Sequence, residues 1–294
     1  MENVKHYISK KRPSLSKSSL TTYSSILRNL YKRVFKDEDY KLDKFENTKP
    51  VLAYLSDIPP NRRKTILSAL VIITDKKEYR DLMLSDVRDY NKDINKQEKT
   101  PAQEASWVSK ADITRIYKEL KQNADLIYKK KNKTTADLQQ IQNFIIMAVL
   151  GSVFIPPRRS KDYVDFKIKG VHNDNDNYMI KNKFVFNSYK TARTYGQQEV
   201  TIPVQLRNII KKWGTLNPTD YLLFDTNMNQ LSAVKLNQRL NKIFGGKKVG
   251  VNQLRHTYLT DKYADTIEQK KKVKKDMEEM GSSSSMLNTY VKED

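Results

Sequence analysis

One segment of this chain has no polar face to turn towards solvent. Between Leu138 and Val153 most positions are apolar, and in a helix their side chains lie nearly all the way round. The pair Pro156-Pro157 cannot continue a helix and therefore marks its end. We expect a buried central helix around which the C-terminal part of the chain packs. Its core-forming side chains are Ile141, Phe144, Ile145, Ile146, Ala148, Val149 and Leu150.

A segment almost without large apolar residues divides the chain. Residues 91–105 offer little to a hydrophobic core, and we interpret residues 93–105 as a linker. This predicts an N-terminal domain over residues 1–92 and a second domain over residues 106–294. The length of 294 residues suits one large domain or two ordinary ones.

The N-terminal domain is predicted to be helical. Apolar residues recur at three- and four-residue spacing between about residues 14 and 90, and Ser16 or Ser18 is placed to cap the first long helix. Pro59-Pro60 precedes another helix, whose entry, residues 61–64, is basic. That entry either meets phosphates at a helix N-terminus or is an ordinary solvated first turn.

The second domain combines helices with a short strand region between about Tyr163 and Pro203. Residues 173–177, an alternation of Asn and Asp, predict a turn; the glycine and terminal glutamate of an EF-hand are missing, so we expect no metal there. Strands over 183–188 and 197–202 flank a turn with Gly196 and predict a hairpin. The expected fold class is mainly α with a small antiparallel β-sheet.

The charge balance favours a polyanionic partner. The chain has 55 Lys+Arg against 34 Asp+Glu, a formal net charge of +21, which points to nucleic acid before an anionic membrane. The absence of cysteine excludes disulfides, thiolate chemistry and Cys-bearing zinc sites, and only three histidines are present. No apolar run approaches the roughly 20 residues of a membrane span. The N-terminus lacks the apolar core of a signal peptide, so we expect a soluble, intracellular protein.

Four groups in the second domain suit cleavage of a DNA backbone. In-line attack on phosphorus needs a nucleophile, cations on the non-bridging oxygens and an acid for the departing 5′ oxygen. Arginine donates two parallel hydrogen bonds and keeps its charge, and a lysine near other cations has a lowered pKa. A tyrosine ester preserves the energy of the broken phosphodiester. In chain order these groups are Arg159 (or its neighbour Arg158), Lys190, Arg255 and Tyr290.

Short motifs surround each of these groups. They are Pro156-Pro157-Arg158-Arg159 with Asp162-Tyr163, Tyr189-Lys190-Thr191 with Tyr195-Gly196-Gln197, Leu254-Arg255-His256-Thr257-Tyr258, and Met280-Gly281-Ser282-Ser283 before Tyr290. Together, over essentially the whole chain, they resemble the two arginine boxes, the lysine hairpin and the nucleophile box of the tyrosine recombinase (integrase) family. The resemblance is greatest to members carried by large DNA viruses, virophages and related mobile elements.

The resemblance implies a helical core-binding domain, a linker and a mixed α+β catalytic domain that together recombine DNA site-specifically. It implies that Tyr290 attacks to form a 3′-phosphotyrosyl intermediate, that Arg159 and Arg255 bind the phosphate, and that Lys190 is the general acid. Double-stranded DNA is the implied partner, with a homotetramer on two DNA sites during synapsis. No cofactor or metal is implied.

Two positions depart from the family's pattern. Asn252 stands where the family usually has histidine, three residues before the second arginine, and Ser282 stands where histidine or tryptophan usually follows the glycine. Both keep a hydrogen-bonding group, so we retain them as site residues and expect the change to affect turnover more than fold. His256 lies about 100° around the helix from Arg255, so we expect it to have a structural role.

Other functions remain open at this point. A type IB topoisomerase shares the chemistry but acts as a monomer, so the oligomeric state on DNA separates the two. The missing histidines motivate a second alternative, a catalytically weakened DNA-binding protein that keeps the fold. An RNA-binding protein is a third alternative, although the sequence contains no RNA-module signature.

Overall fold

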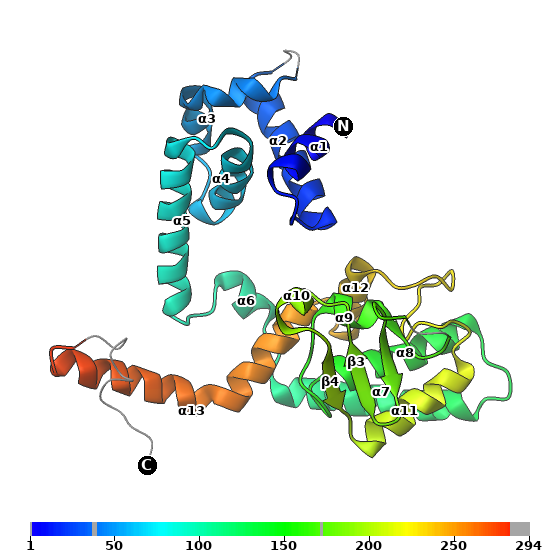
Figure 1. Cartoon of the computed structure of the whole chain (residues 1–294). Coiled ribbons are helices and arrows are strands. Elements are labelled where there is room, and N and C mark those ends of the chain that lie inside the picture. The colour runs from blue at the N-terminus through cyan, green and yellow to red at the C-terminus, as the bar shows by residue number, and fades with distance from the viewer. Residues whose placement is uncertain (1, 37–39, 171–172, 283–294) are drawn as a thin grey trace. The chain divides into compact units, whose positions relative to one another are not determined.

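The computed structural model describes residues 2–36, 40–170 and 173–282, and the chain divides into two compact units (Figure 1). Unit 1 is Met1–Lys99 and unit 2 is Thr100–Asp294, and each has its own hydrophobic core. The division falls among the residues expected as a linker. That segment is largely helical, because α5 continues to Asn95 and α6 covers Pro101–Ser106.

Unit 1 is helical throughout its described residues. Its elements are α1 (Glu2–Lys11), α2 (Lys17–Val34), the 3-10 helix η1 (Leu42–Glu46), α3 (Thr48–Leu55), α4 (Pro60–Thr74) and α5 (Lys77–Asn95) (Figure 1). Ser16 caps α2, its hydroxyl accepting a hydrogen bond of 3.1 Å from the backbone N–H of Ser19. The apolar spacing read from the sequence becomes the buried face of α2 and α4, with Leu27, Leu67 and Leu70 fully buried.

The basic entry to α4 contains a residue that turns inward. Arg63 donates two hydrogen bonds, of 2.9 and 2.7 Å, to the carboxylate of Asp86 on α5, which is 1% exposed. The bond to Asp86 raises the pKa of Arg63. The sequence left two roles open for this entry, phosphate binding or an ordinary solvated turn. Arg63 has neither role, because its side chain joins α4 to α5.

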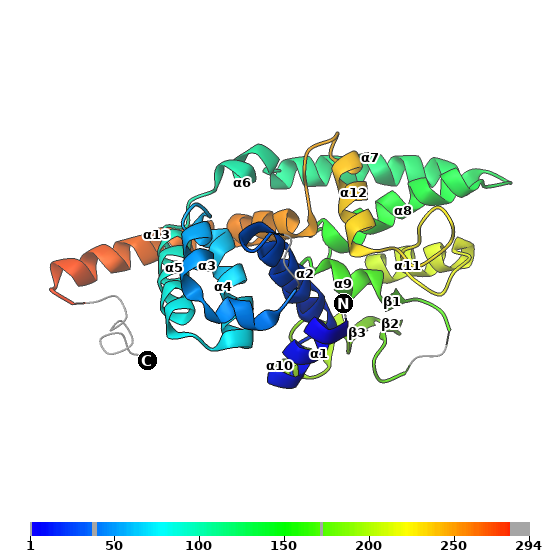
Figure 2. The ribbon, with the colours of Figure 1, turned by 90° about the horizontal axis from the view of Figure 1, so that it is seen from above.

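Unit 2 is built around α8 (Thr135–Leu150), the helix predicted to be buried. Every residue from Phe144 to Leu150 is buried, which confirms that prediction, although the helix ends at Leu150 and not at Val153. α7 (Lys110–Lys129) runs alongside α8 in Figure 2, and α11 (Val204–Leu216) also packs against it. The remaining helices are α9 (Ser160–Val164), α10 (Ala192–Tyr195), α12 (Ala233–Ile243) and α13 (Val251–Glu279).

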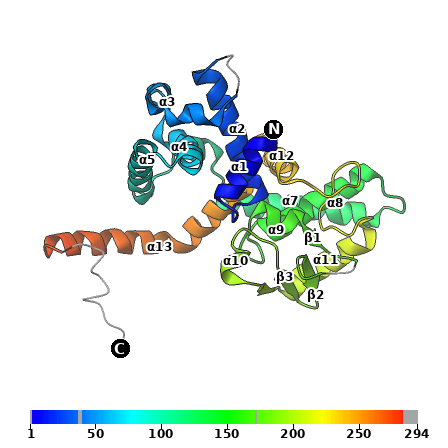
Figure 3. The ribbon, with the colours of Figure 1, turned by 45° about the horizontal axis from the view of Figure 1, so that its top comes forward.

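A four-stranded sheet completes unit 2, in the order β1-β2-β3-β4 (Figure 3). β2 (Asn177–Ile180), β3 (Lys183–Phe186) and β4 (Gln198–Thr201) pair antiparallel, and the hairpin of β3 and β4 is the one predicted. β1 (Phe166–Lys167) pairs parallel with β2, so the sheet is mixed and the expectation of a wholly antiparallel sheet was wrong for this strand. A strand of two residues carries no alternation pattern from which its direction could be predicted.

No helix among the described residues has the length and apolar character needed to cross a membrane. The helices are instead set by caps and by burial of one face. At the start of α8, Thr134 and Asp137 form a capping box in which each side chain accepts from the other's backbone N–H. Lys130 also donates to Asp137, at 2.6 Å. Lys130 first, and then Thr134, lower the pKa of Asp137 to about 2.

This cap predicts a pH-dependent contribution to the stability of unit 2. Because the pKa of Asp137 is lower in the folded chain than the roughly 3.9 of an unfolded one, the stabilisation is present above about pH 4 and is lost as the pH falls towards 2. Asp137→Asn should therefore be less stable than the parent chain at pH 7, and the difference should shrink over that range.

Urea unfolding followed by tryptophan fluorescence measures this, since both tryptophans, Trp107 and Trp213, lie in unit 2. Asp125→Asn, which removes an exposed ion pair with Lys121 on α7, is the control. A stability difference for Asp137→Asn that stays constant from pH 7 to the acid range would contradict the prediction.

Candidate active site

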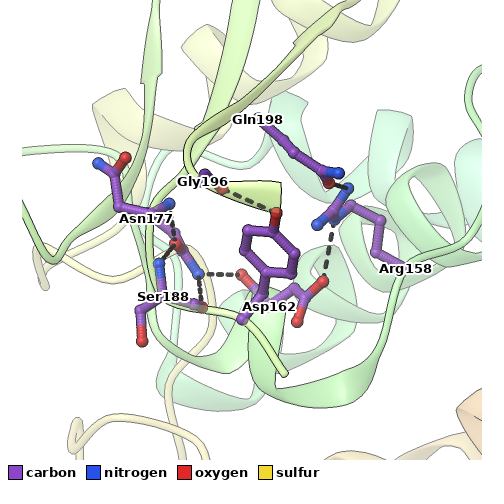
Figure 4. A network of polar contacts seen from close by, with 8 residues as sticks. Arg158, Asp162, Asn177, Ser188, Gly196 and Gln198 are labelled. Atoms are coloured by element: carbon purple, nitrogen blue, oxygen red, sulfur yellow. Dashed lines mark hydrogen bonds and ion pairs between the residues drawn. The ribbon is translucent and has the colours of Figure 1, made fainter. Parts of the chain in front are cut away.

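Arg158 lies inside unit 2 as a structural brace. Its Nε donates to Oδ2 of Asp162 at 2.9 Å, and its Nη1 donates to Oε1 of Gln198, also at 2.9 Å (Figure 4). Its guanidinium carbon lies 4.0 Å from the ring centre of Phe186 and 5.1 Å from that of Tyr189. These contacts occupy the side chain and leave Arg158 poorly placed to bind a phosphate.

Arg159 is the available member of the arginine pair. It precedes α9 as its N-cap residue, is partly exposed, and forms no hydrogen bond or ion pair through its side chain with any residue that the structure describes. Its charge acts on two neighbours, since it lowers the pKa of both Asp162 and Arg255. The sequence left open which arginine would bind a phosphate, and these contacts favour Arg159 over Arg158.

Arg255 reaches the same region from the first turns of α13. Its Nη1 donates to Oδ1 of Asn252 at 3.3 Å, and it has no ion pair among the described residues. Partial burial, and then the charge of Arg159, lower the pKa of Arg255, while Asp162 opposes that change. Two arginines far apart in sequence thus converge, partly desolvated, where an anion would relieve their repulsion.

The first turns of α13 are firmly anchored. Val251 and Leu254 are buried in the core of unit 2, and the hydroxyl of Thr257 donates to the carbonyl of Val108 at 2.8 Å. Asn252 and His256 lie on the exposed side of these turns. The side chain of His256 makes no hydrogen bond with the described residues, so the structural role expected for it is not seen there.

Asp162 interacts electrostatically with all three arginines and is 2% exposed. Its Oδ2 accepts from Arg158, whereas its Oδ1 is buried without a hydrogen-bond partner among the described residues. Burial raises the pKa of Asp162, and Arg158 and Arg159 act in the opposite direction. The cluster of Arg158, Arg159, Arg255 and Asp162 keeps a net positive charge.

Lys190 is exposed in the connection between β3 and β4. The predicted hairpin is present, and its connection holds the short helix α10. The hydroxyl of Tyr189 donates to the carbonyl of Gly196 at 2.8 Å and so joins the two sides of the connection. Lys190 itself makes no hydrogen bond or ion pair with the described residues.

The described part of the nucleophile box, Met280 to Ser282, is not brought to the arginines. Gly281 has a φ of 69° and its N–H bonds to Glu278, while the N–H of Ser282 bonds to Met277 at 2.8 Å, so these residues form the C-terminal cap of α13. α13 bends at Tyr263 and then extends away from the rest of unit 2 (Figures 1–3). At about 1.5 Å per residue, about 40 Å of helix separates Arg255 from Ser282. Tyr290 lies outside the described residues.

Sequence reasoning missed one residue at the centre of this region, Asn177. Its Nδ2 donates to the carbonyls of Asp162 and Ser188, at 3.1 and 2.9 Å, and its Oδ1 accepts from the backbone N–H groups of Asn187 and Ser188 (Figure 4). The only signal was its place at the end of the Asn-Asp run, just before a strand. That signal predicts a turn and gives no sign of a buried, fully bonded amide.

Comparison with known proteins adds a structural likeness. No protein-family model matches the chain, and no curated protein matches its sequence. Among solved structures, the chain is similar to the crystal structure of XerA recombinase, with a TM-score of 0.35 and 13% sequence identity. That similarity covers 89% of this chain and 83% of the other. Within residues 2–36, 40–170 and 173–282, no three His, Asp or Glu side chains are grouped so as to hold a metal ion.

The different surroundings of the two adjacent arginines predict different effects on stability. Arg158→Ala leaves the buried carboxylate of Asp162 without its ion-pair partner, which should lower the free energy of unfolding of unit 2 by about 3 kcal/mol. Arg159→Ala removes a cation that repels Arg255 but also favours the carboxylate of Asp162, so its loss should be much smaller. Urea unfolding followed by tryptophan fluorescence compares the two variants. Equal losses would show that the two arginines do not differ in this way.

Proposed function

We propose that this chain is a site-specific tyrosine recombinase, or integrase, that cuts and rejoins double-stranded DNA through a 3′-phosphotyrosyl intermediate. The observation that carries the proposal is the convergence of Arg159 and Arg255, neither paired with a carboxylate, beside a loop that presents Lys190. The net charge of +21 supports a DNA partner. The helical domain of residues 1–92 would bind the duplex together with the catalytic domain of residues 106–294, and four copies would assemble on two sites.

The chemistry assigns one task to each group. Arg159 and Arg255 donate hydrogen bonds to the non-bridging oxygens, where negative charge grows in the transition state. The phenolic oxygen of Tyr290 gives its proton to solvent water and bonds to phosphorus as the bond from phosphorus to the 5′ oxygen breaks. Lys190 gives that oxygen a proton. Because Oδ1 of Asn252 accepts from Arg255, its Nδ2 remains to donate to the phosphate. Attack by a 5′ hydroxyl reverses the step and rejoins the strand.

The proposal sets a geometric requirement on α13. A fully extended chain from Ser282 to Tyr290 spans at most about 28 Å, whereas about 40 Å of helix, bent at Tyr263, separates Ser282 from Arg255. A further bend of α13 at Tyr263, its single residue with non-helical angles, would bring Tyr290 within easier reach of the arginines of the same chain. Alternatively, a second copy in the assembly would supply Tyr290. Ser282, which belongs to the same segment, would contribute only in that arrangement.

The distance of Ser282 from Arg255 supports one second candidate, a DNA-binding protein of this architecture that does not cleave. A trapping experiment separates the two functions. The full chain is incubated with a labelled pool of random-sequence duplexes that each carry one nick, so that the short cleaved strand diffuses away and rejoining fails. We expect a covalent protein–DNA band on a denaturing gel and none with Tyr290→Phe. Retarded DNA without a covalent band would support the non-cleaving candidate.

Arg255→Ala should separate binding from cleavage. The variant loses one of many phosphate contacts, so its affinity for the trapped duplex should fall by less than about tenfold, whereas the rate of adduct formation should fall by about 10²- to 10³-fold. Lys248→Ala, just before α13, is the control for the loss of one nearby positive charge. Losses of the same size in binding and in cleavage would contradict the assignment of Arg255 to the transition state.

A further inference from the structure

The connection between β3 and β4 is tied down at its first end. We define this connection together with the first residue of β4, residues 187–198, as the lysine loop. The side chain of Asn177 holds both backbone N–H groups at the start of the loop, Asn187 at 2.9 Å and Ser188 at 2.8 Å. Its Nδ2 also bonds to the carbonyl of Asp162 in α9. Asn187 returns the contact, since its own Nδ2 donates to the carbonyl of Asp176 at 2.9 Å.

The other end of the lysine loop is tied to the same short segment. Gln198 ends the loop and accepts from Arg158, which in turn holds the carboxylate of Asp162. Both ends of the loop are therefore attached to residues 158–162 (Figure 4). That segment includes Arg159. The bond from Tyr189 to Gly196 closes the loop between the two attachments.

We infer that Asn177 and Gln198 are positioning residues that hold Lys190 at a set place relative to Arg159. The amide of Asn177 is fully buried and makes four hydrogen bonds, which is all that an asparagine side chain can make. A general acid acts only within hydrogen-bond reach of its target, and a displacement of about 1 Å costs on the order of 10²-fold in rate. The inference rests on the proposed function, because it concerns how the acid of that reaction is held.

Changing the leaving atom tests this role directly. In a duplex with sulfur in place of the bridging 5′ oxygen at the trapped junction, the leaving group is a thiolate. Because a thiol has a pKa of about 8.5, it departs without a proton from an acid. Lys190→Ala should therefore be slow on the oxygen duplex and near the parent rate on the sulfur duplex. A fault in binding the phosphate would slow cleavage of both duplexes.

Asn177→Ala and Gln198→Ala should repeat the pattern of Lys190→Ala. We expect adduct formation on the oxygen duplex to fall by about 10²-fold for Asn177→Ala and by about tenfold for Gln198→Ala, which unties one end only. On the sulfur duplex both variants should lie within about threefold of the parent chain, with unchanged affinity for the duplex. The matched control is Gln197→Ala, an exposed glutamine next to Gln198, which should behave as the parent on both duplexes.

The outcomes separate the positioning role of Asn177 and Gln198 from the proposed function. Equal losses on the oxygen and sulfur duplexes, or no loss on either, would overturn the positioning role. Gln198 is only half-buried, so its variant decides the point if Asn177→Ala does not fold. If the parent chain forms no adduct with either duplex, the proposed function itself fails, and the inference fails with it.

Discussion

The ion pair between Arg158 and Asp162 is the interaction on which the arrangement of the site depends. A carboxylate that is 2% exposed is costly to bury unless a cation bonds to it, and Arg158 supplies that bond. Arg158 lies over the ring of Phe186 and also bonds to Gln198 at the start of β4. One guanidinium therefore connects α9, β3 and β4, and the residue after it, Arg159, is left at the surface of this braced segment.

The electrostatics of the cluster explain why the remaining arginines stay available. Asp162 is close enough to oppose the lowering of the pKa of Arg255, yet its hydrogen-bonded oxygen is occupied by Arg158. It thus moderates the repulsion between Arg159 and Arg255 without forming an ion pair with either. A carboxylate paired with Arg159 or Arg255 would compete with a phosphate for the same donors. Because Asp162 is paired with Arg158, it does not compete in this way.

Sequence reasoning could predict the features that depend on local pattern. The burial of α8 follows from side chains such as Ile141 and Phe144, and the hairpin of β3 and β4 follows from strands on either side of Gly196. The different roles of Arg158 and Arg159 could not be predicted, because adjacent residues at a helix entry point in directions that only the packed neighbours decide. Asn177 was missed for the same reason, since its four bonds reach backbone groups that are distant in sequence.

α13 meets two demands that differ along its length. Its first turns are anchored by Leu254 and by the bond from Thr257 to Val108, so Arg255 is held rigidly. Beyond the bend at Tyr263 nearly all its side chains are exposed, and little packing fixes the direction of the second half. The packing that places Arg255 therefore does not fix the direction of the second half of α13. In the proposed reaction, attack by Tyr290 would depend on that direction, set either by a further bend within the chain or by contact with another copy.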